Sequence, residues 1–313
     1  MFKVPMPFMV HMNLGYLIKL PMIKMIRIFF LLLLLPFGGY AQQESHFSTD
    51  GFSSFWQNPA TSGTLDKLSF NFLGRLQWVG VESAPQTFMF NSSGRLELNQ
   101  LKNKSLEDRI GVGVNLIGEQ VGFQNKWVFQ VPLNYQFKLG ETYLSAGLSV
   151  GFRAIIMSND WVPPQTLFDP LLPGDVSGTV FNMDAGLFWY AENFYAGISS
   201  TQLTEANSGG LHMVRHYHVQ GAYKFAVGQH YIYPQLQIIA NSGGVGFWNL
   251  NYFQFKDDIF SIGAGVGAGY DLLLAATFRY KIFKIAYNFE YHTGSLSEYT
   301  KGSHELRLTF AWK

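Results

Sequence analysis

Apolar and polar side chains alternate along the carboxyl-terminal part of the chain, and this period constrains the fold more than any other feature. The alternation runs through residues 283–292, stops in a polar stretch and resumes over residues 305–312. Because successive side chains of a strand point to opposite faces, both segments predict strands with one apolar and one polar face. The apolar faces are rich in aromatic residues and the chain ends on such a strand, which is typical of a transmembrane barrel.

The composition favours strands rather than helices as the membrane-crossing elements. Aromatic residues make up 17% of the chain and charged residues 14%, against about 25% charged residues in soluble domains. Beyond the amino terminus, no apolar run approaches the roughly 18 residues of a membrane helix. We therefore expect an all-β fold, namely a transmembrane antiparallel up-and-down β-barrel.

The composition also excludes several classes of partner and site. The chain has no cysteine, which rules out a disulfide framework, thiolate metal ligands and a lipid-modified amino-terminal cysteine. Its formal net charge is +1, so neither a nucleic acid nor another highly charged partner is indicated. We expect no cofactor.

The amino terminus has the pattern of a secretory signal peptide. Basic residues precede a short apolar run, and small residues follow it. The apolar run is shorter than a membrane anchor requires, so we expect residues 1–41 to be removed by cleavage between Ala41 and Gln42. Met22 and Met25 are alternative start positions. An export signal ahead of a barrel pattern predicts location in the outer membrane.

Strand-like segments follow one another at short intervals through the rest of the chain. We expect a periplasmic lead-in at residues 42–67 and a barrel at residues 68–313, with about fourteen strands, an even number as in bacterial barrels. The predicted strands are residues 68–78, 86–98, 109–118, 126–138, 141–153, 178–190, 193–200, 213–227, 229–239, 245–256, 259–269, 271–280, 283–292 and 305–312.

The lengths of the connections predict which way the barrel faces. Bacterial barrels have short periplasmic turns and longer external loops. Even-numbered connections include the short ones at residues 139–140, 192–193, 227–228 and 257–258, and odd-numbered ones include the long ones at 154–177, 201–212 and 294–302. This order places both chain termini on the periplasmic side. Residues 99–107 and 269–271 are exceptions to it.

A set of small, polar and aromatic residues surrounds the first predicted strand. The set consists of Asn58, Pro59, Gly63, Arg75, Gln77, Trp78, Gly80, Ala84, Pro85 and Thr87. Proline restricts the residue before it to extended conformations, so Asn58 to Gly63 predicts a bent segment at the periplasmic mouth. Arg75 and Gln77 share the polar face of their strand and point into the lumen. Arg75 either pairs with a lumen carboxylate such as Glu97 or binds a partner directly.

The spacing of these residues resembles the PorP/SprF family, outer-membrane proteins of the type IX secretion system of Bacteroidetes. The stretch from Gly302 to Leu306 also resembles the usual ending of that family. The resemblance implies a non-enzymatic component that assists export or surface attachment of a secreted protein, such as a gliding adhesin. Its implied partners are outer-membrane lipid, the type IX translocon, periplasmic ring components and the secreted surface protein.

An alternative function from the residues alone is a passive porin or transporter of small or apolar solutes. The polar faces carry charges of both signs, which suits either an open lumen or a bonded network that fills it. The long loop at residues 154–177 carries an unusual apolar set, Trp161, Phe168, Leu171 and Leu172. We expect this loop either to plug the barrel or to contact a partner.

Three patterns that suggest chemistry are better explained as parts of a barrel. His212, His216 and His218 lie close in sequence, but no third metal ligand accompanies the last two on their strand face. The glycines from Gly263 to Gly269 alternate in strand period, which predicts a small-residue lumen face rather than a phosphate loop. His292 and Ser303 could meet on neighbouring strands, yet no nucleophile elbow accompanies them, so we expect no enzyme activity.

Overall fold

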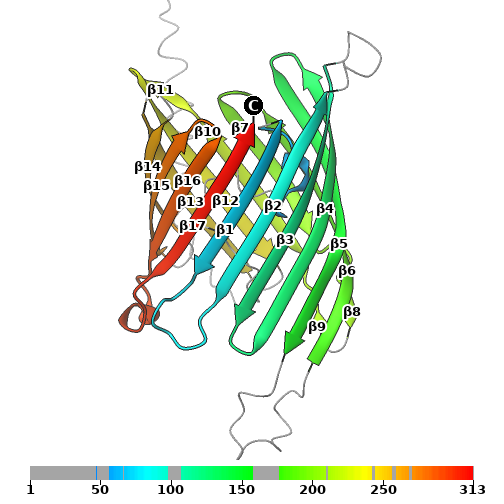
Figure 1. Ribbon diagram of the computed structural model, residues 1–313, viewed down its shortest axis with the longest axis vertical. Coiled ribbons are helices and arrows are strands. Elements are labelled where there is room, and N and C mark those ends of the chain that lie inside the picture. Colours follow the sequence, from blue (N-terminus) through cyan, green and yellow to red (C-terminus); the bar gives the residue numbers. More distant parts are fainter. Residues whose placement is uncertain are drawn as a thin grey trace, which may run out of the picture. The chain divides into compact units, whose positions relative to one another are not determined.

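The chain forms one large antiparallel sheet that closes into a barrel (Figure 1). The computed structural model describes residues 47, 56–65, 67–97, 107–157, 176–208, 211–241, 244–255, 259–267 and 270–312. Residues 39–313 belong to one compact unit. The sheet has 15 strands by hydrogen bonding, of which β10 and β11 are two parts of one wall strand interrupted at Lys224, so the wall has 15 − 1 = 14 strands.

The wall strands are β1 (Leu68–Leu76), β2 (Gln86–Glu97), β3 (Arg109–Val121), β4 (Gln124–Leu139), β5 (Thr142–Met157), β6 (Val176–Tyr190), β7 (Phe194–Thr201), β10 (His216–Tyr223), β11 (Phe225–Val227), β12 (His230–Asn241), β13 (Gly244–Gln254), β14 (Phe260–Val266), β15 (Leu272–Tyr280), β16 (Phe283–Tyr291) and β17 (Ser303–Trp312). The pair β8 (Asn207–Ser208) and β9 (Leu211–His212) forms a separate small hairpin. Two 3₁₀ turns, η2 (Pro59–Thr61) and η6 (Ser295–Glu298), lie outside the wall strands.

The first strand closes the barrel by pairing with the last. Leu68 of β1 lies opposite Trp312 of β17, and the register continues without a break to Leu76 opposite His304. Each wall strand is antiparallel to its neighbours, and β10 and β11 both pair directly with β12, one after the other along it. The expectation of an antiparallel up-and-down barrel of about fourteen strands is therefore confirmed.

Several strand ends differ from the prediction. β3 and β5 extend to Val121 and Met157, because both continue to pair with the first residues of β4. The last strand begins at Ser303 rather than at residue 305. The expected strand at residues 213–227 begins at His216 and is interrupted at Lys224, whose backbone N–H donates to the carbonyl of Asn193 instead of to the ladder.

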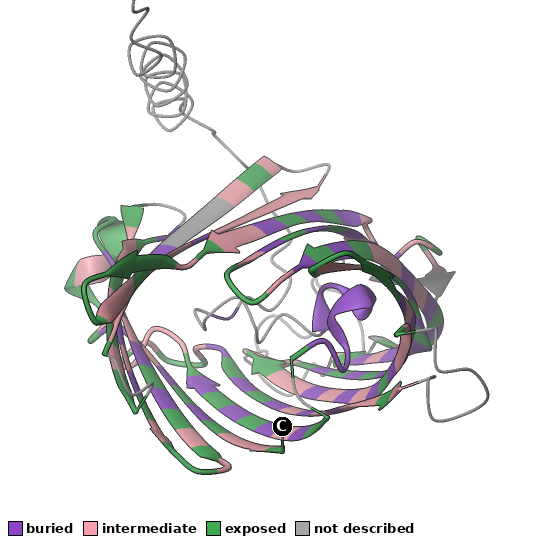
Figure 2. Cartoon of the chain, turned by 90° about the horizontal axis from the view of Figure 1, so that it is seen from above, coloured by how far each residue is buried: buried purple, intermediate pink, exposed green. Residues whose placement is uncertain are grey.

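The two faces of the wall differ as the alternation predicts. On β5, Leu148 and Phe152 are 56% and 54% exposed, whereas the adjacent Ser149 and Arg153 are 3% and 1% exposed. Figure 2 shows this alternation of buried and exposed residues around the ring of strands. The outer face is apolar and aromatic while most of the inner face is polar, so the arrangement suits lipid outside.

The connections at the two ends of the barrel differ in length. We call the end at which β1 begins and β17 ends the terminal end, and the opposite end the loop end (Figure 1). Tight turns at the terminal end pass through Gly140 and Gly228, both with positive φ of 61°, a conformation that glycine adopts without strain. At the loop end, β3 and β4 are joined by a tight turn through Gly122, whereas β16 and β17 are joined by a longer loop that contains η6. That the terminal end faces the periplasm stays a prediction.

No helix among the described residues is long and apolar enough to cross a membrane.

Charge on the outer face tests the lipid contact. We expect Leu148→Arg, in the middle of β5, to lower the free energy of unfolding by about 2–4 kcal/mol, because a cation at the bilayer midplane is costly. Leu139→Arg is the matched control, since Leu139 ends β4 and is exposed to a similar extent, 52%. It should cost about 0–1 kcal/mol. Urea unfolding of the barrel in lipid vesicles measures both, and equal losses would contradict the membrane depth assigned to these residues.

Candidate functional site: the closing seam and the lead-in

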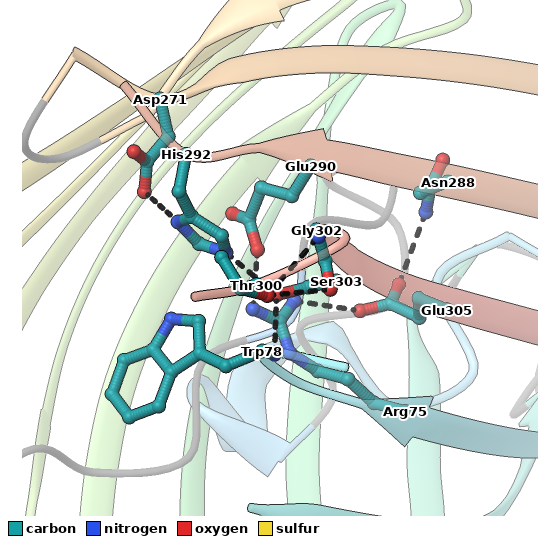
Figure 3. Close-up of polar contacts among 10 residues, drawn as sticks. All are labelled: Arg75, Trp78, Asp271, Asn288, Glu290, His292, Thr300, Gly302, Ser303 and Glu305. Atoms are coloured by element: carbon teal, nitrogen blue, oxygen red, sulfur yellow. Dashed lines mark hydrogen bonds and ion pairs between the residues drawn. The ribbon is translucent and has the colours of Figure 1, made fainter. Parts of the chain in front are cut away.

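Arg75 stands at the junction of the first and last strands. It extends from β1 toward Glu290 of β16 at 2.5 Å and toward Glu305 of β17 at 3.3 Å (Figure 3). All three side chains are buried, with 4%, 6% and 2% of their area exposed. Asn288 donates a hydrogen bond of 3.0 Å to the other oxygen of Glu305. The cluster thus ties three strands together on the inner face.

The partner of Arg75 differs from the carboxylate considered in the sequence analysis. Arg75 lies directly opposite Glu305 in the β1–β17 register, while its neighbour on β2 is Thr87. Glu97 lies at the other end of β2, where it pairs with Arg95 at 3.5 Å. The sequence could not supply this pairing, because the partner strand comes from the far end of the chain.

A chain of hydrogen bonds lies beside the ion cluster at the loop end. Asp271 contacts His292 Nδ1 at 2.7 Å, and His292 Nε2 contacts the Ser303 hydroxyl at 2.8 Å (Figure 3). The order of acid, imidazole and hydroxyl is that of a serine hydrolase triad. However, Ser303 is only 2% exposed and its oxygen already accepts a 3.1 Å hydrogen bond from the Trp78 backbone N–H. The hydroxyl therefore acts as a cross-link between β1 and β17.

The loop after β16 is joined to the continuation of β1. Val79 N–H donates to the Gly302 carbonyl at 2.9 Å, and Lys301 N–H donates to the Val79 carbonyl at 2.7 Å. The Trp78 ring lies edge-on to His292 with centroids 6.3 Å apart. Gly80 has a φ of +104° and approaches the Tyr299 carbonyl, which explains glycine at this position.

The remaining motif residues after β1 also hold this corner together. Gln77 N–H donates to the Pro85 carbonyl at 3.0 Å, and Ala84 precedes that proline in the same loop. The Thr87 hydroxyl donates to Glu119 of β3 at 3.3 Å. We call the junction of β1 with β17 the closing seam. The motif residues from Arg75 to Thr87 therefore form its corner at the loop end.

The motif residues before β1 lie inside the barrel rather than beside it. We use "lead-in segment" for residues 56–64, which Figure 2 shows within the ring of strands. Asn58 caps the η2 turn, since its side-chain oxygen accepts a 3.0 Å hydrogen bond from Ala60 N–H. Its amide nitrogen donates to the Leu187 carbonyl of β6 at 3.2 Å. One side chain thus shapes the turn and fixes it to the wall.

Two wall amides hold the backbone of the lead-in segment. Asn134 of β4 donates to the carbonyls of Pro59 and Ser62 at 3.1 and 2.8 Å, and Gln136 donates to Ser62 at 3.1 Å. On β7, the Ser199 hydroxyl donates to the Gln57 carbonyl at 2.7 Å. Buried carbonyls need such donors, because no strand pairs with this segment.

Glycines in the wall make room for the lead-in segment. A Cβ at Gly147 of β5 would lie 2.6 Å from the Ala60 Cα, and one at Gly186 of β6 would lie 2.9 Å from the Asn58 Cγ. A Cβ at Gly197 of β7 would lie 3.0 Å from the Asn58 amide nitrogen. We call Gly147, Gly186 and Gly197 the glycine cradle. Their absence of side chains lets the backbone of Pro59 and Ala60 approach the wall closely.

An apolar row crosses the otherwise polar inner face. Leu73, Met89, Ile117 and Val128 lie opposite one another on β1 to β4, and none is more than 1% exposed. Trp56 and Phe47 cover this row and pack edge-on with centroids 6.1 Å apart. The sequence analysis missed these residues. Their signal is an apolar residue on the polar face of four successive strands.

Polar side chains form a second row, which crosses β17, β1, β2 and β3. Thr309 donates to Asn71 at 2.7 Å, Asn71 to Asn91 at 3.0 Å, and Asn91 to Asn115 at 2.5 Å. Further along the wall, Gln130 of β4 and Asn182 of β6 donate to Asp184 of β6. The polar groups of this part of the lumen are therefore hydrogen-bonded to one another. This is the arrangement expected if a bonded network fills the lumen.

Some predicted residues lie outside the described part of the chain. These are Ala41, Gln42, Trp161, Phe168, Leu171 and Leu172. The His212 side chain is likewise not described, whereas His218 contacts the Thr201 hydroxyl at 3.1 Å and His216 contacts the Asn241 amide at 3.0 Å. No group of residues that could hold a metal ion occurs among the described residues.

Comparison with known proteins agrees with the barrel. The family described as "Type IX secretion system membrane protein PorP/SprF" matches residues 39–310. The toluene transporter TbuX of Ralstonia pickettii is 11% identical with a TM-score of 0.51, covering 87% of this chain and 96% of its own. The toluene transporter TodX of Pseudomonas putida (11% identity, TM-score 0.46, 85% and 93% covered) and Omp33 of Acinetobacter baumannii (10%, 0.45, 79% and 98%) are also similar. No curated protein matches the chain.

Removal of the Arg75 charge tests the ion cluster that Arg75 forms with Glu290 and Glu305. We expect Arg75→Met to lower the free energy of unfolding by about 3–5 kcal/mol, because it removes a paired cation from two buried carboxylates. Adding Glu290→Gln and Glu305→Gln should recover most of that loss. Arg95→Met is the control, since the Arg95–Glu97 pair is more exposed, and it should cost about 0–1 kcal/mol. Urea unfolding in vesicles measures all three, and failure of the triple variant to recover stability would contradict the pairing.

Proposed function

Because the chain belongs to the type IX secretion system membrane protein PorP/SprF family, we propose that it assists the export or surface attachment of a secreted protein, such as a gliding adhesin. The observation that carries this proposal is the extent of the family match, which spans residues 39–310 and so includes the barrel up to the last two residues of β17. The protein is an outer-membrane barrel of a family of secretion-system membrane proteins, and we infer from this that it is not an enzyme.

The proposed partners are reached from the two ends of the barrel. We assign the translocon and the secreted protein to the loop end, and the periplasmic ring components to the terminal end. The loop-end corner is an ordered surface, because hydrogen bonds join residues 301–303 to the continuation of β1. A surface ordered before binding loses little conformational entropy when a partner docks, which favours association.

Packing inside the barrel disfavours the alternative of a passive porin. An open channel would leave the inner face of β1 to β4 in water, yet Leu73, Ile117 and Val128 are buried there beneath Trp56. Apolar side chains that pack beneath Trp56 do not suit a lumen that is permanently filled with water. The likeness to the toluene transporters reflects the fold.

Deletion of the gene for this chain distinguishes the role in secretion from that of a passive porin. In the bacterium that makes it, we expect deletion to abolish surface display of one secreted protein while solute uptake stays at the level of the parent strain. Surface proteomics and uptake assays measure the two effects, and restoring the gene should restore display. Unchanged display together with reduced uptake would favour the porin and overturn the proposal.

Aromatic residues of the long loop provide a finer test. We expect Trp161→Ala with Phe168→Ala to reduce co-purification of the translocon in mild detergent, because large aromatic side chains anchor interfaces. The control is Trp189→Ala with Phe181→Ala, which removes the same side chains from the outer face of β6. Both variants should keep heat-modifiable migration, the sign of a folded barrel. Undiminished co-purification of partners by the loop variant would count against this role.

A further inference from the structure

The width of the barrel raises the question of what fills it. Barrels of about eight strands are filled by their own side chains, whereas barrels of 16–18 strands enclose an aqueous channel. A wall of 14 strands is nearer to the second class. Nevertheless, inward-facing residues such as Ile117, Gln130 and Gln136 are 0% exposed. Something other than the wall must cover part of this inner face.

The lead-in segment supplies that cover. Trp56, Asn58 and Ala60 are 2%, 1% and 0% exposed, and they contact the inner faces of different strands. Trp56 lies over the apolar row of β1 to β4, while η2 contacts β4, β5 and β6. The segment thus lies across the lumen on the side of the barrel formed by β1 to β7.

The bonds that hold the lead-in segment are different from those that hold the wall strands together. Wall strands are held by backbone ladders, whereas side chains such as Asn134, Gln136 and Ser199 hold the lead-in segment. Lys67, just before β1, is anchored to the wall, since its N–H donates to the Trp312 carbonyl at 2.8 Å. Residues 56–64 can therefore leave their position without breaking a strand pair.

The glycine cradle fits the η2 turn and its cap residue Asn58 closely. For Gly147, the nearest atoms to an added Cβ belong to Pro59 and Ala60, and for Gly186 the nearest belong to Asn58. Bare backbone at these places in a strand weakens the strand, so close approach of another segment accounts for it. The bonds of Asn58 to the carbonyls of Leu187 and Ile198 hold the turn in this seat.

We propose that the lead-in segment is a removable stopper, which keeps the barrel impermeable while it is seated on the glycine cradle and opens a water-filled path when it leaves. The segment directly precedes the first wall strand, so a protein that binds the chain ahead of residue 56 could withdraw it from the lumen. The path it vacates would be lined by the apolar row and by the amides that now bind its backbone.

Gly147→Ala is the test variant and Gly74→Ala its matched control. The added methyl of the first would collide with the Ala60 backbone, whereas nothing lies within 4 Å of a Cβ at Gly74. In planar lipid bilayers, we expect no stable current from the wild-type barrel or from Gly74→Ala, and stepwise channel currents from Gly147→Ala. Asn58→Ala is a second variant in case Gly147→Ala does not fold, and it should give the same currents.

A thiol label reports directly on the seat. The chain has no cysteine, and Ser62 is 0% exposed. With Ser62→Cys, a water-soluble maleimide should leave the introduced thiol unlabelled in the otherwise wild-type barrel and in the Gly74→Ala background. In the Gly147→Ala and Asn58→Ala backgrounds, labelling should become complete. Heat-modifiable migration identifies the folded protein used in each measurement.

Three results would overturn the proposal. The first is a wild-type barrel that conducts as freely as the cradle variants. The second is a folded cradle variant that is labelled but carries no current, because its vacated lumen is still closed. The third is a folded cradle variant that is neither labelled nor conducting, because the seat then does not hold the segment. None of these results depends on secretion, so the stopper and the proposed function can fail independently.

Discussion

The closure of β1 on β17 is the constraint on which the rest of the structure depends. In hydrocarbon no water is available to unpaired backbone groups, so a sheet can span the bilayer only without free edges. The continuous register from Leu68 to Leu76 removes the last two edges. On the inner face, Arg75 and the Asp271–His292–Ser303 chain reinforce that junction, where their bonds are shielded from water.

The outer and inner faces of the closed wall have different chemical requirements. The outer face needs apolar and aromatic side chains, a composition that suits contact with lipid. The inner face buries many polar groups, and amide rows, ion clusters and the backbone of the lead-in segment supply hydrogen bonds for them. Specific residues are therefore concentrated inside the barrel, at the seam and around the glycine cradle.

The wall could be predicted from the sequence because its information is local. Alternation along residues such as 126–138 identifies a strand and its faces, and turn glycines mark the ends. The contacts of the candidate site are not local. Arg75 meets Glu305 only when the last strand pairs with the first, and Asn58 meets Leu187 only when the sheet has formed as far as β6. Leu73 breaks the alternation, because it is apolar although it faces inward. Its packing against Trp56 accounts for this, and that contact is known only from the structure.

The position of the lead-in segment has a consequence for the order of biogenesis. The segment precedes all wall strands in the chain, yet its seat is made by β4 to β7. Contacts between neighbouring strands form over short loops, whereas the β1–β17 pairing joins the two ends of the barrel sequence and carries a larger loop-closure entropy. A half-built, curved sheet can thus receive the segment from its open side before the final strand docks. The segment then serves as an internal template that sets the curvature of the growing wall.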